Sequence, residues 1–279
     1  MQNGPRYLTE LDINQAYPLT NLAAGAGVGQ TGTGLSIDQL GQVGQTGDGR
    51  FYRLVSVGGT STVKAGTLLV SPAASSNYAG LAIPSSQPSN TATGSGSSSN
   101  SALSKGSFSF NVTNGSGAAI TADQFAGGYV EVLQTSGTNE GPVAYRLAGN
   151  TAAATSASCT LFLSEPLDQP EALVAGTDTV NLVESPFSGV LASSTLGRPV
   201  GVVTVQVPNT ASETYCAWVQ TAGHCLVNAD ATGVTVGEAV AQSTTTAGDV
   251  TVAGATSNQI GVALDTKTSA VASVHLTML

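Results

Sequence analysis

Side chains able to do acid–base, nucleophilic or metal chemistry are few in this sequence, and most are far apart. It contains two histidines and three cysteines, and only His224 and Cys225 are neighbours. A cysteine–histidine dyad needs both side chains aimed at one point, whereas neighbours in a β-strand point to opposite faces. We therefore expect His224 to face outwards while Cys216, Trp218 and Cys225 fill a core. A metal cluster of Cys216, His224 and Cys225 across a hairpin is the less favoured alternative, because it has no obvious fourth ligand.

The number of cysteines bears on their redox state. Cys159, Cys216 and Cys225 are an odd count, and the first residues, Met1 to Tyr7, show no apolar run of the kind that a signal peptide needs. Both features argue against a disulfide framework. We expect all three thiols to be reduced and mostly buried.

Other chemical motifs lack the context that their chemistry requires. The segment 27–32 matches G-x-G-x-x-G, but the flanking sequence has neither a strand pattern before it nor a helix pattern after it, so we interpret it as a chance match. A pair of acids could serve a glycosidase, but aromatic residues, which form sugar platforms, are only 5% of the chain. We expect these acids to be solvated loop residues, with a small Ca²⁺ site as the less favoured alternative. They are Glu165, Asp168, Glu171, Asp178 and Glu184.

The second histidine, His275, lies in a terminal strand and is expected at the surface or in an interface. No G-x-S-x-G or P-loop motif occurs. The sequence therefore predicts no catalytic residue, no cofactor-binding residue and no metal ligand, and we expect that the protein is not an enzyme.

Charge excludes two classes of partner. The formal net charge is −9, and the eight lysines and arginines are scattered without a basic stripe. Nucleic acid and anionic membranes are therefore poor partners. No segment is long and apolar enough to span a bilayer.

Strand patterns dominate the sequence, and helical periodicity is nearly absent. Ser107–Thr113 alternates strictly between polar and apolar residues, and Val203, Val205 and Val207 alternate with polar ones. Two capping-box patterns, at 36–39 and 121–124, predict no more than one or two helical turns each. The predicted class is all-β, with two or more sandwich or barrel units, an extended N-terminal arm and little helix.

The same patterns predict five segments. Residues 1–49 are Gly-rich and form an arm that orders against a neighbour or its own body. Residues 50–84 supply strands that pack with the C-terminal domain, and 85–105 is a Ser/Gly-rich loop or linker. Residues 106–186 form a middle β domain, and 187–279 form a C-terminal β-barrel domain. The apolar residues of the arm are candidate interface residues: Tyr7, Leu8, Leu11, Ile13, Tyr17 and Leu19.

Six short segments that combine glycine with aromatic or apolar residues follow one another along the chain: Gly41–Arg53, Gln124–Val132, Gly141–Gly149, Pro199–Val202, Tyr215–Gly223 and Ala247–Ala263. In this order they resemble a family of virion structural proteins of tailed bacteriophages. The resemblance spans roughly residue 40 to the end, and the sequence departs from the family at Ser85–Lys105, at Cys216 and at His224–Cys225.

The resemblance implies a β-rich, homotrimeric decoration or cement protein. Its partner would be the major capsid protein, which it would bind on the outer capsid surface of a virion assembled in the host cytoplasm, bridging capsomers and stabilising the shell. The alternative is a tail fibre, spike or adhesin that binds a host glycan. A β-helical spike should show short stacked repeats, which are missing, and a glycan binder should have more than one Trp and seven Tyr. A cellular surface-layer protein is a third, less favoured class.

Overall fold

The computed structural model confirms the all-β prediction. It describes residues 6–9, 13–14, 16–18, 40–73, 75–84, 87, 102–103, 106–115, 117–135, 141–168, 173–195, 197–208, 215–254 and 257–278. The chain divides into two compact units. The sheet unit combines Met1–Leu22 and Gly27–Ala73 with Pro186–Leu279, and the barrel unit contains Ala23–Ala26 and Ala74–Ser185.

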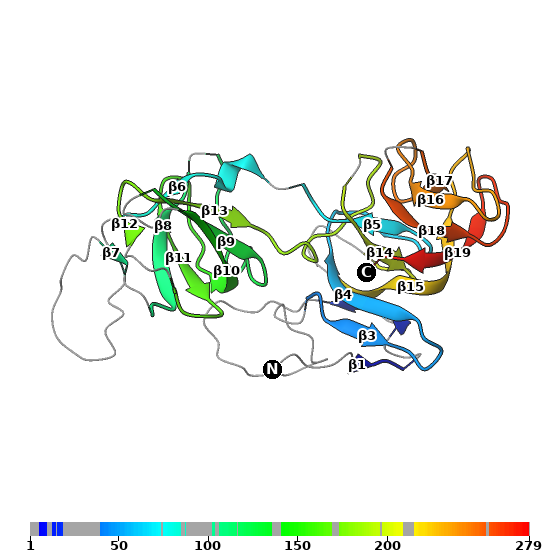
Figure 1. Ribbon diagram of the computed structural model, residues 1–279, viewed down its shortest axis with the longest axis horizontal. Coiled ribbons are helices and arrows are strands. Elements are labelled where there is room, and N and C mark those ends of the chain that lie inside the picture. Colours follow the sequence, from blue (N-terminus) through cyan, green and yellow to red (C-terminus); the bar gives the residue numbers. More distant parts are fainter. Residues whose placement is uncertain are drawn as a thin grey trace. The chain divides into compact units, whose positions relative to one another are not determined.

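The barrel unit is a closed six-stranded barrel (Figure 1). The barrel strands are β6 (Leu81–Ala82), β8 (Ser109–Thr113), β9 (Tyr129–Gln134), β10 (Gly141–Asn150), β11 (Ser158–Leu163) and β13 (Thr179–Val183). They follow the order β10-β11-β8-β6-β13-β9 around the wall. A two-stranded sheet of β7 (Ala102–Leu103) and β12 (Leu173–Val174) and a 3-10 helix, η2 (Ser76–Tyr78), belong to the same unit.

Alternation in the sequence explains the barrel wall. In β8 the side chains of Phe110 and Val112 are fully buried while their neighbours are half-buried, as expected for a strand with one face inside. The interior is one apolar cluster drawn from residues between Tyr78 and Leu182. Tyr78 and Phe125 meet edge to face in it, with ring centroids 5.0 Å apart.

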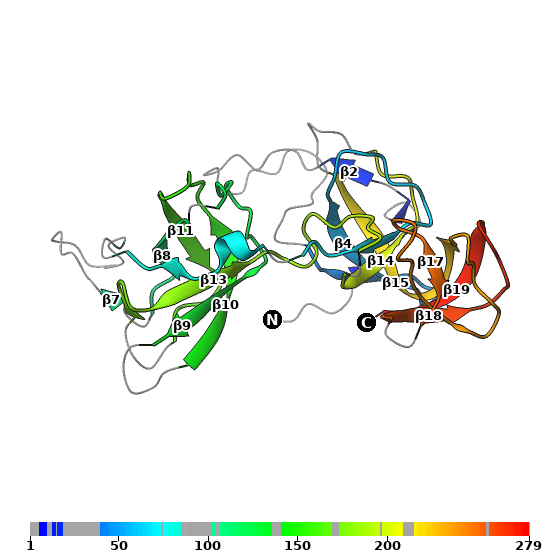
Figure 2. The same ribbon diagram turned by 90° about the horizontal axis from the view of Figure 1, so that it is seen from above.

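The sheet unit is built on an eleven-stranded sheet. The strands are β1 (Arg6–Tyr7), β2 (Ala16–Pro18), β3 (Val43–Gln45), β4 (Phe51–Val57), β5 (Leu68–Val70), β14 (Pro199–Val203), β15 (Tyr215–Asn228), β16 (Ala239–Gln242), β17 (Val250–Val252), β18 (Gln259–Ala263) and β19 (Val271–Thr277). The main path runs β1-β3-β4-β15-β19-β18-β16-β17. In addition, β14 and β2 pair with β15, and β5 pairs with β14. Figure 2 shows β17, β18 and β19 together at one end of this unit.

Strand β15 is the central element of the sheet unit. Its first half pairs with β4 from Tyr215 to Ala222, and its second half pairs with β19 from Ala222 to Asn228. Residues 216–221 are buried on both faces, whereas 224–227 alternate between exposed and buried. The first half is therefore enclosed like a central strand, and the second half has one face in solvent.

The structure draws two boundaries differently from the sequence patterns. Strand β6 pairs with β13 and β8, so the last part of the 50–84 segment lies in the barrel unit, whereas β4 and β5 pair with the C-terminal strands β15 and β14. A barrel was expected for residues 187–279, but the closed barrel is formed mainly by the middle segment. Residues 187–279 instead contribute strands to the eleven-stranded sheet. The reason is non-local pairing: β6 completes the barrel wall, which closes only with it.

In the N-terminal region the described strands pair with the chain's own sheet, which is the second of the two alternatives expected for residues 1–49. β1 pairs with β3 in parallel, and β2 pairs with β15. The strand expected over 203–207 ends at Val203, and Val207 instead forms a single bridge with Val63.

The capping-box pattern at 121–124 forms a turn rather than a helix. The Gln124 side chain accepts a hydrogen bond from the Thr121 amide at 3.0 Å, as a capping box requires. The chain then turns through Gly127, which has a φ of +72° that no helix continues. The similar pattern at 36–39 lies outside the described residues. In the described part of the chain, no helix has the length and apolar character to cross a membrane.

Candidate functional site

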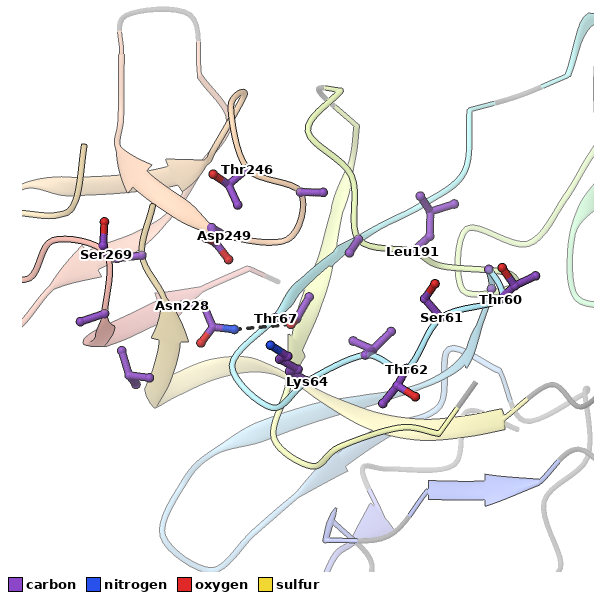
Figure 3. A pocket seen from close by; sticks show the side chains of 18 residues that line it. Thr60, Ser61, Thr62, Lys64, Thr67, Leu191, Asn228, Thr246, Asp249 and Ser269 are labelled. Carbon is purple, nitrogen blue, oxygen red and sulfur yellow. Dashed lines mark hydrogen bonds between the residues drawn. The ribbon is translucent and has the colours of Figure 1, made fainter. Parts of the chain in front are cut away.

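A hollow in the sheet unit is lined by 18 residues, of which half are polar or charged and half are glycine or apolar (Figure 3). Its volume is about 790 Å³. The loop from Gly58 to Lys64 forms one wall, and the turns that contain Asp249 and Ser269 lie across from it. The remaining lining comes from Thr67, Leu191, Ala192, Asn228, Ala229, Thr246, Ala247, Ala270 and Val271.

Backbone bonds and one amide side chain hold the loop wall in place. Val63 exchanges hydrogen bonds with Val207, and the Gly66 amide donates to the Val203 carbonyl at 2.7 Å. Asn228 Nδ2 donates to the carbonyl of Ala65 at 3.2 Å. The pocket wall is therefore fixed by strand β15 and by the segment after β14.

The pocket contains one cationic and one anionic side chain. Lys64 is exposed at the rim, and Asp249 is half-buried. Burial raises the pKa of Asp249, and the neighbouring charge of Asp230 raises it further. Serine and threonine hydroxyls and the Asn228 amide supply the other polar side-chain groups, so this arrangement can bind a neutral polar segment or small molecule through hydrogen bonds.

Asp230 is buried next to this pocket and organises it. Its Oδ1 accepts from the amides of Thr232 and Gly233 at 2.9 and 3.0 Å, and its Oδ2 accepts from the hydroxyls of Ser243 and Thr245 at 2.6 and 3.1 Å. Burial opposes ionisation of Asp230, but these hydrogen bonds outweigh it and lower its pKa. Each carboxylate oxygen thus accepts two hydrogen bonds, and together these bonds join two turns.

A second hollow of about 450 Å³ lies beside His224 in the same unit. Arg50, Gln220, Leu226 and Val271 are among its lining residues. The guanidinium of Arg50 donates to Asp48 at 2.7 Å. Gln220 donates to the carbonyl of His224 at 2.8 Å, which fixes the start of the exposed part of β15.

The cysteines are buried and free, as predicted. Cys216 and Cys225 lie in the same strand, β15, and belong to different core clusters, so the alternative in which they face each other across a hairpin is wrong. Burial raises the pKa of each of these thiols to about 12. Burial also raises the pKa of Cys159, which lies in the barrel core. None of the three is poised as a nucleophile.

The two histidines lie directly opposite each other on neighbouring strands, which the sequence did not predict. His224 on β15 is the register partner of His275 on β19, and both side chains are exposed, as expected from the alternation. A hydrogen bond of 2.7 Å joins His224 Nε2 to the Ser273 hydroxyl. Only the pairing of β15 with β19 brings the two residues together.

The acids between 165 and 184 do not all lie in solvated loops. Asp178 is fully buried and accepts from the amides of Thr135 and Val174 at 2.8 and 2.7 Å, so its predicted exposure is wrong. Glu184 accepts from Gln124 at 2.7 Å. Glu171 and the G-x-G-x-x-G segment lie outside the described residues. Within the described residues, no group of three or more His, Cys, Asp or Glu is placed to hold a metal ion.

The candidate interface residues of the N-terminal region have different environments. Leu8 and Ile13 are buried in the sheet unit's own core with Trp218, so they are not free to contact a partner, and this part of the prediction is wrong. Tyr7 is 80% exposed. Tyr17 lies in β2, where its side chain is not among those described, and Leu11 and Leu19 lie outside the described residues.

Sequence reasoning missed the pocket residues Lys64 and Asp249 and the neighbouring carboxylate of Asp230. A signal was present for Asp230, since Asp230-Ala231-Thr232-Gly233 has the spacing of an Asx turn, in which the carboxylate binds amides two and three residues on. No local signal places Asp249 and Lys64 in one hollow, because the loops that carry them come together only in the folded sheet unit.

Comparison with known protein families, with curated proteins and with solved structures finds no match to this chain.

Proposed function

We propose that this protein is a structural component of a tailed-bacteriophage particle, a homotrimeric decoration or cement protein. In this role it binds the major capsid protein on the outer surface of the shell and stabilises the shell by bridging capsomers. The resemblance of the segments between Gly41 and Ala263 to virion structural proteins supports the proposal, as does the weakly charged composition.

The observation that carries the proposal is that two aspartates and all three cysteines are buried and serve the fold. Asp178 and Asp230 are buried and bind their own loops, and the three cysteines are buried in apolar cores. These groups hold the fold together. With these five groups committed to the fold, the weakly charged chain is suited to contact with other proteins through neutral surface.

Exposed apolar side chains and strand edges supply places for such contacts. Tyr7 stands on β1, which ends the main path of the sheet, and strand addition at such an edge gives backbone hydrogen bonds without charge. On the barrel wall, Tyr129 and Phe162 are 44% and 43% exposed. Many copies bound to one shell would add avidity to weak individual contacts.

Two measurements on particles test this proposal. Gel densitometry of purified virions should give hundreds of copies per particle, whereas a tail component would be present in six or twelve. Particles that lack the protein should lose their DNA at a lower temperature than complete particles. Equal heat resistance of the two kinds of particle, or a copy number of a tail part, would contradict the proposal.

The polar pocket favours a second candidate, a tail fibre, spike or adhesin that binds a host glycan. Hydroxyl-rich walls with one carboxylate, Asp249, can bind sugar hydroxyls. Against it, the lining includes no aromatic residue on which a sugar ring could stack. Glycan-array binding by the purified protein that disappears in Asp249→Ala would favour this candidate over the cement role.

A further inference from the structure

The only two histidines of the chain form one cross-strand pair. β15 and β19 are antiparallel, and His224 is the direct partner of His275 in a register that runs without interruption from Ala222 to Asn228. Residues directly opposite on such a pair project from the same face, with Cβ atoms about 4.5–5.5 Å apart. Both side chains therefore project from the same exposed face, where Nε2 of His224 is hydrogen-bonded to the Ser273 hydroxyl.

The face that carries the pair is open, while the opposite face is closed. Cys225 and Val274, the next residues along the two strands, are 4% and 0% exposed and belong to the apolar core. This core fixes the two backbones beneath the imidazoles. The rings reach into solvent, but their attachment points are held by packed strands.

Two imidazoles at this spacing match the requirement of a transition-metal ion. Zn²⁺ binds imidazole nitrogen at about 2.0–2.1 Å, and Cu²⁺ and Ni²⁺ also favour imidazole ligands. When Ser273 accepts the Nε2 proton of His224, the lone pair of that ring lies on Nδ1, which is then free to bind a metal. Water or a partner surface would complete the coordination sphere.

We propose that His224 and His275 form a cross-strand binding site for a divalent transition-metal ion on the exposed face of β15 and β19. The bound ion joins the two strands at the point where β15 passes from its contact with β4 to its contact with β19. Because the unfolded chain does not hold the two histidines together, the ion binds the folded state preferentially and stabilises it. This site is independent of the proposed role on a capsid.

Thermal unfolding of the full-length protein with added ZnCl2 tests the site. Zn²⁺ should raise the melting temperature, and EDTA should reverse the rise. His224→Ala and His275→Ala should each remove the rise, because a single exposed imidazole is a weak ligand. Thr277→Ala is the matched control, since Thr277 is an exposed residue of the same strand, and it should keep the full response.

A direct measurement identifies the ligands. Titration with CuCl2, followed by electron paramagnetic resonance, should show nitrogen coordination in the parent protein and its loss in the double variant H224A/H275A. Ser273→Ala should weaken Zn²⁺ binding about tenfold if the hydroxyl orients the ring. A melting-temperature rise that persists in the double variant, or a parent protein that shows no nitrogen coordination, would overturn the proposal.

Discussion

Asp230 shows how a single buried carboxylate can determine local structure. Four donors from two turns converge on its oxygens, and the residue is only 3% exposed. The turn that it holds leads to strand β16, and the turn with Ser243 leads to Asp249 in the pocket. Its role is to fix the geometry of the pocket wall rather than to react.

Replacing Asp230 by Asn should destabilise the sheet unit. The amide keeps one acceptor but turns an NH2 group towards donors, so buried hydrogen-bond donors lose their partner. We expect a loss of about 3 kcal/mol in the free energy of unfolding, measured by urea denaturation. Asp249→Asn is the matched control and should be neutral or slightly stabilising, because it removes a charge that Asp230 repels. Equal losses in both variants would contradict this interpretation.

The two carboxylates should respond to pH in opposite directions. The pKa of Asp230 is lowered in the folded protein, so its contribution to stability is present above the unfolded pKa and is lost as the pH falls through the folded pKa. The pKa of Asp249 is raised, so its protonation on acidification favours the folded state. The stability difference between the parent and Asp230→Asn should therefore shrink below about pH 4. Urea denaturation at a series of pH values measures it, and a difference that stays constant to pH 2 would contradict the assignment.

The buried thiols should be inert in the native protein. Burial raises the pKa of Cys216 and Cys225 to about 12, so almost no thiolate exists at pH 8. We expect a colorimetric thiol reagent to label none of the three cysteines in the native state and all three in denaturant. Rapid labelling of the native protein would show that a thiol is accessible.

Strand β18 depends on a close approach of two backbones. Gly261 pairs with Leu276, and a Cβ at Gly261 would collide with the carbonyl oxygen of His275. Gly261→Ala should therefore destabilise the protein by about 2–3 kcal/mol. Gly254→Ala is the control, because its nearest contact, Ser257 Oγ at 3.4 Å, leaves room for a methyl group. Similar melting temperatures for the two variants would show that the strands adjust.

At the scale of the whole molecule, the two units do not follow one another along the chain, because most of the barrel unit lies between the segments that form the sheet unit. The barrel unit is one continuous stretch of described strands with its own apolar core, whereas the sheet unit needs segments from both ends of the chain. In the sheet unit, β4 covers the first half of β15, and β5 pairs with β14. The C-terminal segment alone therefore leaves two buried strand edges unpaired.

Fragments test this organisation. Residues 74–185 should fold alone, giving a β-type circular dichroism spectrum and a cooperative thermal transition. Residues 187–279 should aggregate or stay unfolded unless residues 1–73 are supplied. A soluble, cooperatively folding 187–279 fragment would contradict the need for β4 and β5.

Local pattern in the sequence was sufficient for the class of the fold and for some burial. Alternation at 107–113 predicted a half-buried strand, and the opposite orientations of His224 and Cys225 followed from strand geometry alone. These properties depend on neighbours within a few residues, so the sequence reveals them directly. The apolar character of Leu8 and Ile13 was also evident. The sequence did not show whether these side chains are buried by a partner or by the chain itself.

Tertiary structure alone decided which strands meet and therefore which side chains share a site. The register of β15 with β19 pairs His224 with His275, although 51 positions separate them in the numbering. Likewise, Asp249 and Lys64 share one pocket, and β6 completes a barrel whose other strands follow it in the chain. The physical reason is that strand pairing satisfies backbone hydrogen bonds and buries apolar faces between distant segments, and many registers fit the same local alternation.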